Sequence, residues 1–161
     1  MLPTTPTMNS FGSANWLAQI TNMEEVTYKL TGFQLPEVNA GATPITSRNQ
    51  YVYQESGDHI VYENLELTFI VDENLLNYRK LHAWMENNVA NGQSKQESIF
   101  VHILDNNKKF QGVEVEFLFA FPLRLGQIEM DTSGATSDVT CTVTFAYTKF
   151  IFIDAAIVND E

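Results

Sequence analysis

The sequence has 161 residues, which suits one domain with a sizeable core and leaves little room for two. Its formal net charge is −11, from twenty acidic residues against nine lysines and arginines, so its surface repels phosphate backbones and anionic lipid. Nucleic-acid binding needs clustered basic residues, and the only basic pairs are Arg79-Lys80 and Lys108-Lys109. The single cysteine, Cys141, excludes an internal disulfide and a multi-cysteine metal site.

The first part of the chain, residues 1–13, is rich in Thr, Pro and Ser, and we expect it to form a flexible arm. It has no basic start and no apolar run of signal-peptide length. The longest strongly apolar stretch, Phe117 to Leu123, is too short to cross a bilayer as a helix. We therefore expect no classical secretion and no membrane anchoring.

Two short strands are predicted after this arm. Residues 16–20 and 26–31 both show period-two alternation, which is typical of half-buried strands. The pair Leu35-Pro36 is expected to end the second strand. Residues 37–58 are then predicted to be the least regular part of the domain, with one strand near 50–54. A connection of this length usually has a function.

The next two segments differ in period. Residues 60–72 alternate as a strand, whereas residues 73–90 repeat at three and four positions, which predicts the one substantial helix. Asp72 is the expected N-cap, and Asn91-Gly92 the expected end. The predicted buried stripe of this helix comprises Leu75, Tyr78, His82, Met85 and Val89, widened by Leu81 and Trp84.

The rest of the chain is predicted to be strands. We expect strands at 98–104 and 111–121, the second ended by Pro122, and a long final strand at 139–147. Each of three strands has a predicted inward face. These faces comprise Leu65, Leu67, Phe69 and Val71 of the 60–72 strand, Val113, Val115, Phe117 and Phe119 of the 111–121 strand, and Val139, Cys141, Val143, Phe145 and Tyr147 of the final strand. The order of elements predicts a mainly β fold: an antiparallel β-sandwich or partly closed barrel with one flanking helix at about 73–90. The expected division is a flexible N-terminal arm at 1–13, a β domain at 14–152 and a C-terminal extension at 153–161.

The histidines give no indication of a metal site. His59, His82 and His102 lack the close pairing, such as i and i+4, that two ligands on one element need. The loop Asp131-Thr132-Ser133-Gly134 has a little of the character of a cation loop, but it fails the EF-hand spacing and remains a weak possibility. We predict no cofactor and no metal.

No catalytic constellation is found either. Cys141 sits in the middle of a predicted strand on its apolar face, which favours a small core residue over a nucleophile. Glu114 and Glu116 share a strand face, but nothing splits their environments as a catalytic pair requires, so a solvated face is the favoured interpretation. We expect a protein that is not an enzyme.

The order of four motifs is similar to that of the tail tube proteins of T4-like contractile phages and, more loosely, of pyocins and type VI secretion. The first motif is the strand and Leu-Pro of 28–36, and the second runs from Gly57-Asp58 through a strand to the helix. The helix carries a basic-then-Trp pattern at 79–84. The third motif is Phe121-Pro122 followed by 126–131, and the fourth is the Thr-rich strand at 139–147. The resemblance covers about residues 14–152.

This resemblance implies a tail-tube-like fold and a structural role in a virion. Hexameric rings would join their inner sheets into one barrel and would stack into a tube, assembled in the host cytoplasm. The implied partners are other copies of the chain, a sheath protein, and baseplate and tail terminator proteins. A tape measure protein and DNA would pass through the bore without specific binding, and the tube would be driven through the host envelope on sheath contraction.

The resemblance also implies roles for particular residues. If the polar strand faces line the bore, it is hydrophilic and net negative, so that phosphates slide through it. The expected lumen-facing residues are Thr27, Thr31, Glu114, Glu116, Thr140, Thr142 and Thr144. The segment 37–58 would reach the next ring, with expected contacts at Gly41, Pro44, Arg48, Tyr51, Tyr53 and Gly57.

Three alternatives remain open. A tube initiator or baseplate hub subunit shares the tube fold, and an Hcp-like type VI secretion tube would be exported from a bacterium without capsid genes. An unrelated carbohydrate-binding β-sandwich would stay monomeric and expose aromatic residues in a groove.

Overall fold

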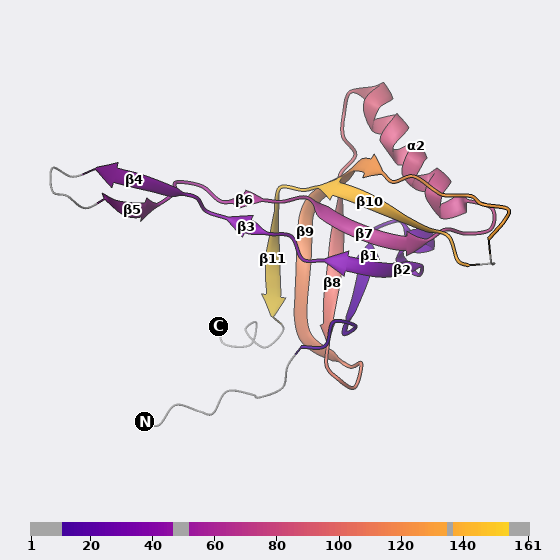
Figure 1. Cartoon of the computed structure of the whole chain (residues 1–161), viewed down its shortest axis with the longest axis horizontal. Coiled ribbons are helices and arrows are strands. Elements are labelled where there is room, and N and C mark those ends of the chain that lie inside the picture. The colour runs from indigo at the N-terminus through magenta and orange to yellow at the C-terminus, as the bar shows by residue number, and fades with distance from the viewer. Residues whose placement is uncertain (1–10, 47–51, 135–136, 155–161) are drawn as a thin grey trace.

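The computed structural model of the protein describes residues 11–46, 52–134 and 137–154, which form a mainly β fold with one substantial helix (Figure 1). Within these ranges the strands are β1 (Trp16–Ile20), β2 (Leu30–Gln34), β3 (Val38–Asn39), β4 (Ala42–Thr46), β5 (Val52–Ser56), β6 (Val61–Tyr62), β7 (Leu65–Ile70), β8 (Glu97–Leu104), β9 (Phe110–Leu125), β10 (Thr140–Ala146) and β11 (Lys149–Asp154). The helices are the single turn α1 (Glu24–Thr27) and the long α2 (Leu76–Asn91).

The strands form two antiparallel layers that share one long strand. Sheet A comprises β1, β8, the first part of β9, and β11. Sheet B comprises the last part of β9, then β10, β7 and β2. The strands of sheet B run across those of sheet A (Figure 1). The predicted mainly β architecture with a flanking helix is therefore confirmed.

The core lies between the two sheets and consists of alternate residues from each strand. Predicted faces on two strands of sheet B are confirmed, because Leu65, Leu67 and Phe69 and then Cys141, Val143 and Phe145 are buried. Ala18, Ile20, Ile99, Val101, Val115 and Phe117 cover them from sheet A. Aromatic rings interlock at one end of this core, where the ring centroids of Phe117 and Tyr147 lie 5.0 Å apart.

The prediction that Pro122 ends its strand is wrong. β9 continues to Leu125, and Pro122 lies opposite Phe145 beside a register shift. A proline is compatible with a strand at such an irregularity, because no ladder hydrogen bond is required from it there. Phe119, predicted to point inward, is instead exposed, because its positive φ of 59° interrupts the alternation and places Ala120 in the core.

α2 begins later than predicted, and the face that it buries differs in part from the predicted face. It starts at Leu76, not 73; the residue before it, Leu75, has a left-handed φ of 56° and no side-chain cap. Asp72 is therefore not the N-cap. The buried residues of α2 are Asn77, Leu81 and Trp84.

The predicted buried stripe of α2 is confirmed at Leu81 and Trp84, but its centre is wrong, because His82 and Val89 are exposed. Trp84 determines the rotation of the helix. Its ring lies 5.9 Å from that of Phe145, and its Nε1–H donates a hydrogen bond of 2.9 Å to the carbonyl of Lys95. These two contacts fix which face of α2 meets the sheets.

The strand predicted at 26–31 is also wrong at its start. Residues 24–27 form the helical turn α1, and β2 begins only at Leu30. The hydroxyl of Thr27 closes this turn, since it accepts from the backbone N–H of Ile20 (3.0 Å) and donates to the carbonyl of Met23 (2.9 Å). Val26 is still buried, which is why the alternation resembled a strand.

The segment 37–58 is more regular than predicted. β3 pairs with β6, β4 pairs with β5 beyond them, and the N–H of Glu63 donates to the carbonyl of Glu37. Residues 37–46 and 52–63 therefore form the two sides of a long β-hairpin that we call the arm, distinct from the predicted N-terminal arm. The arm projects far from the sheets (Figure 1). Its strand predicted at 50–54 lies at 52–56. Close approach at its waist requires glycine, because a Cβ on Gly57 would lie 2.1 Å from the carbonyl oxygen of Ala40.

β11 (Lys149–Asp154) has no counterpart among the predicted strands. This strand pairs with β9 and runs past residue 152, where the C-terminal extension was expected to begin. Most of the predicted N-terminal arm and of that extension lies outside the described residues. The three-part division of the chain therefore stays a prediction.

Asn77 links α2 to sheet B and generates the first prediction. It is fully buried, its amide donates to the carbonyl of Ile70 (2.8 Å), and its Oδ1 accepts from the N–H of Asp72 (3.2 Å). We expect Asn77→Ala to lower the free energy of unfolding by about 1–3 kcal/mol, because it leaves both backbone groups without their partner. Urea denaturation measures this, with the exposed Asn87→Ala as control. Equal stability of the two variants would contradict the assigned role.

Candidate assembly surface

Several strand margins are left open in the described part of the chain. β1 and β11 are the outer strands of sheet A. In sheet B, β2 is one outer strand, and residues 121–125 of β9 pair with β10 alone. Open margins expose backbone donors and acceptors that can pair with another chain.

The outer face of sheet B is almost entirely polar, and we call it the threonine face. The hydroxyl groups of Thr68 and Thr142 lie 3.1 Å apart, and the hydroxyl of Thr31 lies 3.4 Å from the carbonyl of Thr68. The threonine face comprises Thr31, Gln34, Glu66, Thr68, Arg124, Thr140, Thr142 and Thr144. Its charged side chains are one carboxylate and one guanidinium, which flank Thr144 in the sheet register.

The structure brings together four of the seven residues predicted to face a bore. Thr31, Thr140, Thr142 and Thr144 all lie on the threonine face. The other three, Thr27, Glu114 and Glu116, lie elsewhere. The sequence pattern identified polar faces correctly but could not tell which of them belong to the same sheet.

Glu114 and Glu116 lie on the outer face of sheet A, on the opposite side of the sandwich. Glu114 forms an ion pair of 2.8 Å with His102 when that histidine is protonated, and Glu116 accepts a 2.9 Å hydrogen bond from the hydroxyl of Ser98. Both carboxylates are thus engaged in cross-strand contacts. Thr27 closes the α1 turn and belongs to neither face.

The arm carries most of the residues predicted to contact another ring. Gly41 and Pro44 lie on its outgoing side, and Gly57 lies on its return. Tyr53 is on β5, paired with Ile45. Arg48 and Tyr51 lie outside the described residues.

The described part of the arm exposes both charge and apolar surface. Its four carboxylates, on Glu37, Glu55, Asp58 and Glu63, are exposed, and none of them has an ion-pair partner among the described residues. Leu35, Val38, Ile60 and Val61 at its base are exposed as well. An isolated two-stranded hairpin with such a surface is marginally stable in water.

Tyr147 anchors the arm to the body. Its hydroxyl donates a 2.8 Å hydrogen bond to the carbonyl of Glu63, and its ring lies 6.1 Å from that of Tyr62. Burial is the main cause that raises the pKa of Tyr147 to about 12, with smaller contributions from Tyr62 and Glu63. The neutral phenol is therefore the form that the fold stabilises.

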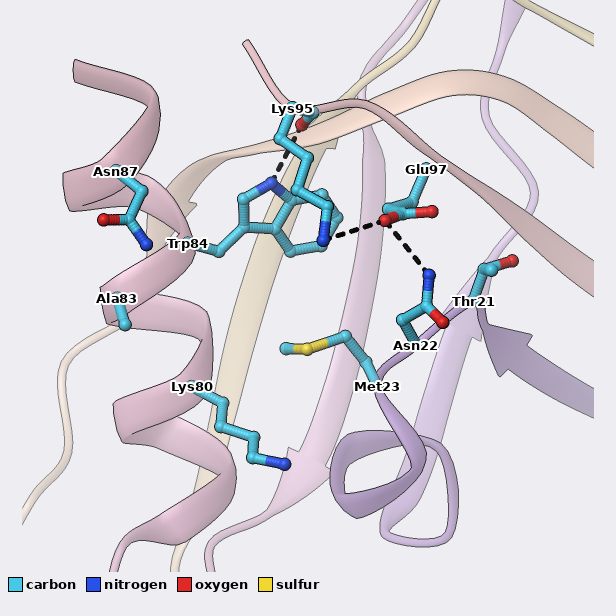
Figure 2. A pocket seen from close by; sticks show the side chains of 9 residues that line it. All are labelled: Thr21, Asn22, Met23, Lys80, Ala83, Trp84, Asn87, Lys95 and Glu97. Atoms are coloured by element: carbon cyan, nitrogen blue, oxygen red, sulfur yellow. Dashed lines mark hydrogen bonds and ion pairs between the residues drawn. The ribbon is translucent and has the colours of Figure 1, made fainter. Parts of the chain in front are cut away.

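An apolar pocket lies between α2, the turn after β1 and the start of β8 (Figure 2). It has a volume of about 270 Å³, with Trp84 and Met23 at its centre. Lys95 bridges to Glu97 at 3.1 Å, and Glu97 accepts from the amide of Asn22 at 3.2 Å. These two contacts join the start of β8 to the turn after β1, and the hydrogen bond from Trp84 to the carbonyl of Lys95 connects α2 to them. The pocket offers no nucleophile with a positioned base.

The side chains that could carry chemistry have structural surroundings. Burial raises the pKa of the Cys141 thiol, and its Sγ points to the carbonyl of Gly126 at 3.4 Å, so the reactive thiolate is disfavoured. The carboxylate of Asp131 accepts hydrogen bonds from the N–H and the hydroxyl of Ser133 in its own loop, and these bonds lower the pKa of the carboxyl group. Within the described ranges, no three metal-ligating side chains cluster, and no helix is long and apolar enough to cross a membrane.

Comparison with known proteins supplies the family. The model of a family described as phage tail tube protein matches residues 2–153. No curated protein matches the chain in sequence.

Similar folds occur among solved structures. A chain in the sheath–tube complex of an extracellular contractile injection system in its extended state aligns with a TM-score of 0.70 at 10% identity, covering 92% of this chain and 95% of that one. A chain of the tube-terminating cap of the anti-feeding prophage reaches 0.73 at 12% identity, covering 94% and 96%. Hcp1 from Flavobacterium johnsoniae reaches 0.54 at 11% identity, covering 86% and 94%. The fold is thus one shared with injection-system tubes and Hcp.

Tyr147 generates the second prediction. Since its folded-state pKa of about 12 lies above the ordinary value of 10, the stability due to its neutral form is complete below pH 10 and is lost as the pH rises toward 12. We expect the melting temperature of the wild-type protein to fall more steeply over this range than that of Tyr147→Phe, which cannot ionise. Thermal melts across the range measure this. The exposed Tyr28→Phe should follow the wild type, and a parallel fall of Tyr147→Phe would contradict the assignment.

Proposed function

Because the chain belongs to the phage tail tube protein family, we propose that it assembles into hexameric rings that stack as the inner tube of a contractile tail of the T4-like type. The family is one of structural proteins, and the chain is not an enzyme. The proposed place of the protein is the virion tail, after assembly in the host cytoplasm.

The arm is the observation that carries this proposal. It extends away from the sheets with exposed apolar residues at its base and four exposed carboxylates, so it buries too little to be stable as a free hairpin (Figure 1). A neighbouring ring is the natural surface for it to contact. A contact that repeats along one axis produces a filament, which is the geometry that a tube needs.

The margins of sheet B support ring formation. Successive strands of this sheet alternate in direction, from the last part of β9 to β2. A copy rotated about a common axis therefore presents β2 antiparallel to the end of β9 in its neighbour. Closing the ring in this way satisfies both open margins and leaves no edge for aggregation.

We assign the threonine face to the bore. Sheet B then lines the tube, and hydroxyl and amide groups keep it wet. The face carries Glu66 and Arg124, whose charges cancel, so the proposed bore is polar. The net negative charge predicted from a face that included Glu114 and Glu116 does not fall on it. DNA or a tape measure protein passes because no cluster of basic side chains can hold phosphates.

The proposed partners follow from the family and from the injection-system likeness. A chain of similar fold occurs in a sheath–tube complex, which supports a sheath partner here. Likeness to chains of a tube terminator and a baseplate supports contacts at the two ends of the tube. On sheath contraction the tube would be driven through the host envelope.

A tube-end subunit is the second candidate function. The tube-terminating cap has a TM-score of 0.73, slightly above the 0.70 of the sheath–tube complex, so the fold suits both positions. An Hcp-like secretion tube is a weaker alternative on the same measure, at 0.54 for Hcp1. Copy number in purified particles separates these positions, because a tube subunit is among the most abundant proteins and a tube-end subunit is not.

The arm generates the third prediction. We expect replacement of residues 42–56 by a two-residue Asn-Gly turn to leave rings intact but to abolish tubes, because the axial contact is lost while the sheet margins remain. Negative-stain microscopy and sedimentation of the purified protein at rising concentration measure this. Long tubes from the shortened protein would refute the axial role of the arm, and a wild-type protein that stays monomeric throughout would refute the proposed function.

The threonine face generates the fourth prediction. In a Cys141→Ala background, we expect Thr142→Cys to react with a bulky maleimide as a monomer and to be protected in assembled tubes, because the reagent can enter only at the ends. Glu116→Cys, on the outer face of sheet A, is the matched control and should react in the tube more than Thr142→Cys. The reverse order of protection would assign the bore to sheet A.

A further inference from the structure

The corner of β9 at residue 119 requires a positive φ, but nothing in the described part of the monomer explains why a phenylalanine occupies this position. The φ of Phe119, 59°, lies in a region that bulky residues rarely adopt, and the residue is 55% exposed. Leu123, four residues further along β9, is 48% exposed beside the register shift with β10. Strained backbone that holds an aromatic ring in solvent persists where the residue has a further role.

Both residues mark the place where β9 loses a partner. Ala120 is the last residue of β9 that pairs with β8, opposite Glu97. From 121 to 125, β10 is the one strand of the described chain that pairs with β9. Phe119 and Leu123 therefore flank an open backbone margin, and we call the two side chains with this margin the β9 edge.

The opposite border of the molecule has a groove of mixed polarity. It lies between β1, the outer strand of sheet A, and β2, the outer strand of sheet B, with a volume of about 310 Å³. Trp16, Leu17 and Leu30 are its large apolar lining residues, and Ser13, Thr27 and Thr31 line it with hydroxyl groups. Leu17 is exposed, so the groove is open to a neighbour.

The β9 edge and the groove occur on one chain at opposite borders of sheet B. An apolar protrusion and a pocket at different places on the same molecule produce a head-to-tail contact, which closes into a ring when the rotation permits. The β2 strand beside the groove is antiparallel to the β9 edge, so strand pairing and apolar packing can form together.

We propose that the β9 edge of one copy docks on the β1–β2 groove of the next, with Phe119 and Leu123 as the apolar anchors of the ring interface. This inference rests on the proposed function. The occupant of the groove is a second copy of the chain. Apolar anchors packed into a pocket carry a large share of the energy of such interfaces.

The test uses purified full-length protein under conditions in which the wild type forms rings or tubes. Phe119→Asn is the chosen variant, because asparagine tolerates positive φ and lacks the ring. We expect it to weaken self-association by about tenfold or more in sedimentation velocity. We expect the melting temperature of its monomer to stay within about 3 °C of the wild-type monomer. Leu123→Asn should also weaken association, and Val89→Asn, an exposed apolar residue on α2, should not.

Complementation shows which surfaces meet. Leu17→Lys should block the groove and leave the β9 edge intact. Phe119→Asn and Leu17→Lys are each expected to stay monomeric, but their equal mixture should form dimers and stop there, because the pair has a single intact interface. The emission of Trp16, in the groove, should shift to shorter wavelength only in the mixture and in wild-type assemblies.

Three outcomes would overturn the inference. Phe119→Asn could assemble as well as Val89→Asn, or the mixture could remain monomeric. Leu17→Lys could change monomer stability without affecting assembly, as expected if the chain's own first ten residues held the groove. If the wild type still assembles in any of these cases, the tube proposal holds and only this inference is overturned. If the wild type itself fails to assemble, the tube proposal is rejected.

Discussion

The membership of β9 in both sheets is the constraint on which the rest of the structure depends. Its first part pairs with β8 and β11, and its last part pairs with β10. Because one strand continues across the corner, the two sheets cross and enclose a single core. The corner needs the irregular conformation at Phe119 and the register shift near Pro122. Without this corner in β9, the threonine face and the outer face of sheet A could not point in opposite directions.

The two outer faces differ in ways that suit different surroundings. The threonine face is polar, and its two charges cancel, so it can border water over its full width. The outer face of sheet A combines exposed Leu17 with cross-strand pairs such as His102 and Glu114. A surface of the second kind is suited to contact with protein, where apolar groups gain from burial and the paired charges keep their partners.

The arm and the open strand margins are surfaces that contacts with other copies of the chain would cover. The body has a well-packed core, yet a two-stranded hairpin extends from it, and within the described residues strand margins are open on both sheets. These features add no stability to an isolated monomer, and open strand margins can pair nonspecifically with other chains. In the proposed tube, repeated contacts between copies would convert these features into lateral and axial interfaces.

The sequence by itself determined the mainly β fold class, because the alternation of apolar and polar residues is a local property that a single strand displays. It predicted the inward residues of β7 and β10 and the polar threonines opposite them. Only the tertiary structure decided which polar faces share a sheet, since register and bulges depend on partners distant in sequence. Thus Thr142 and Glu116 looked alike in the sequence but lie on opposite faces. The rotation of α2 was decided in the same way, by the contacts of Trp84 with Phe145 and Lys95, which no helical periodicity encodes.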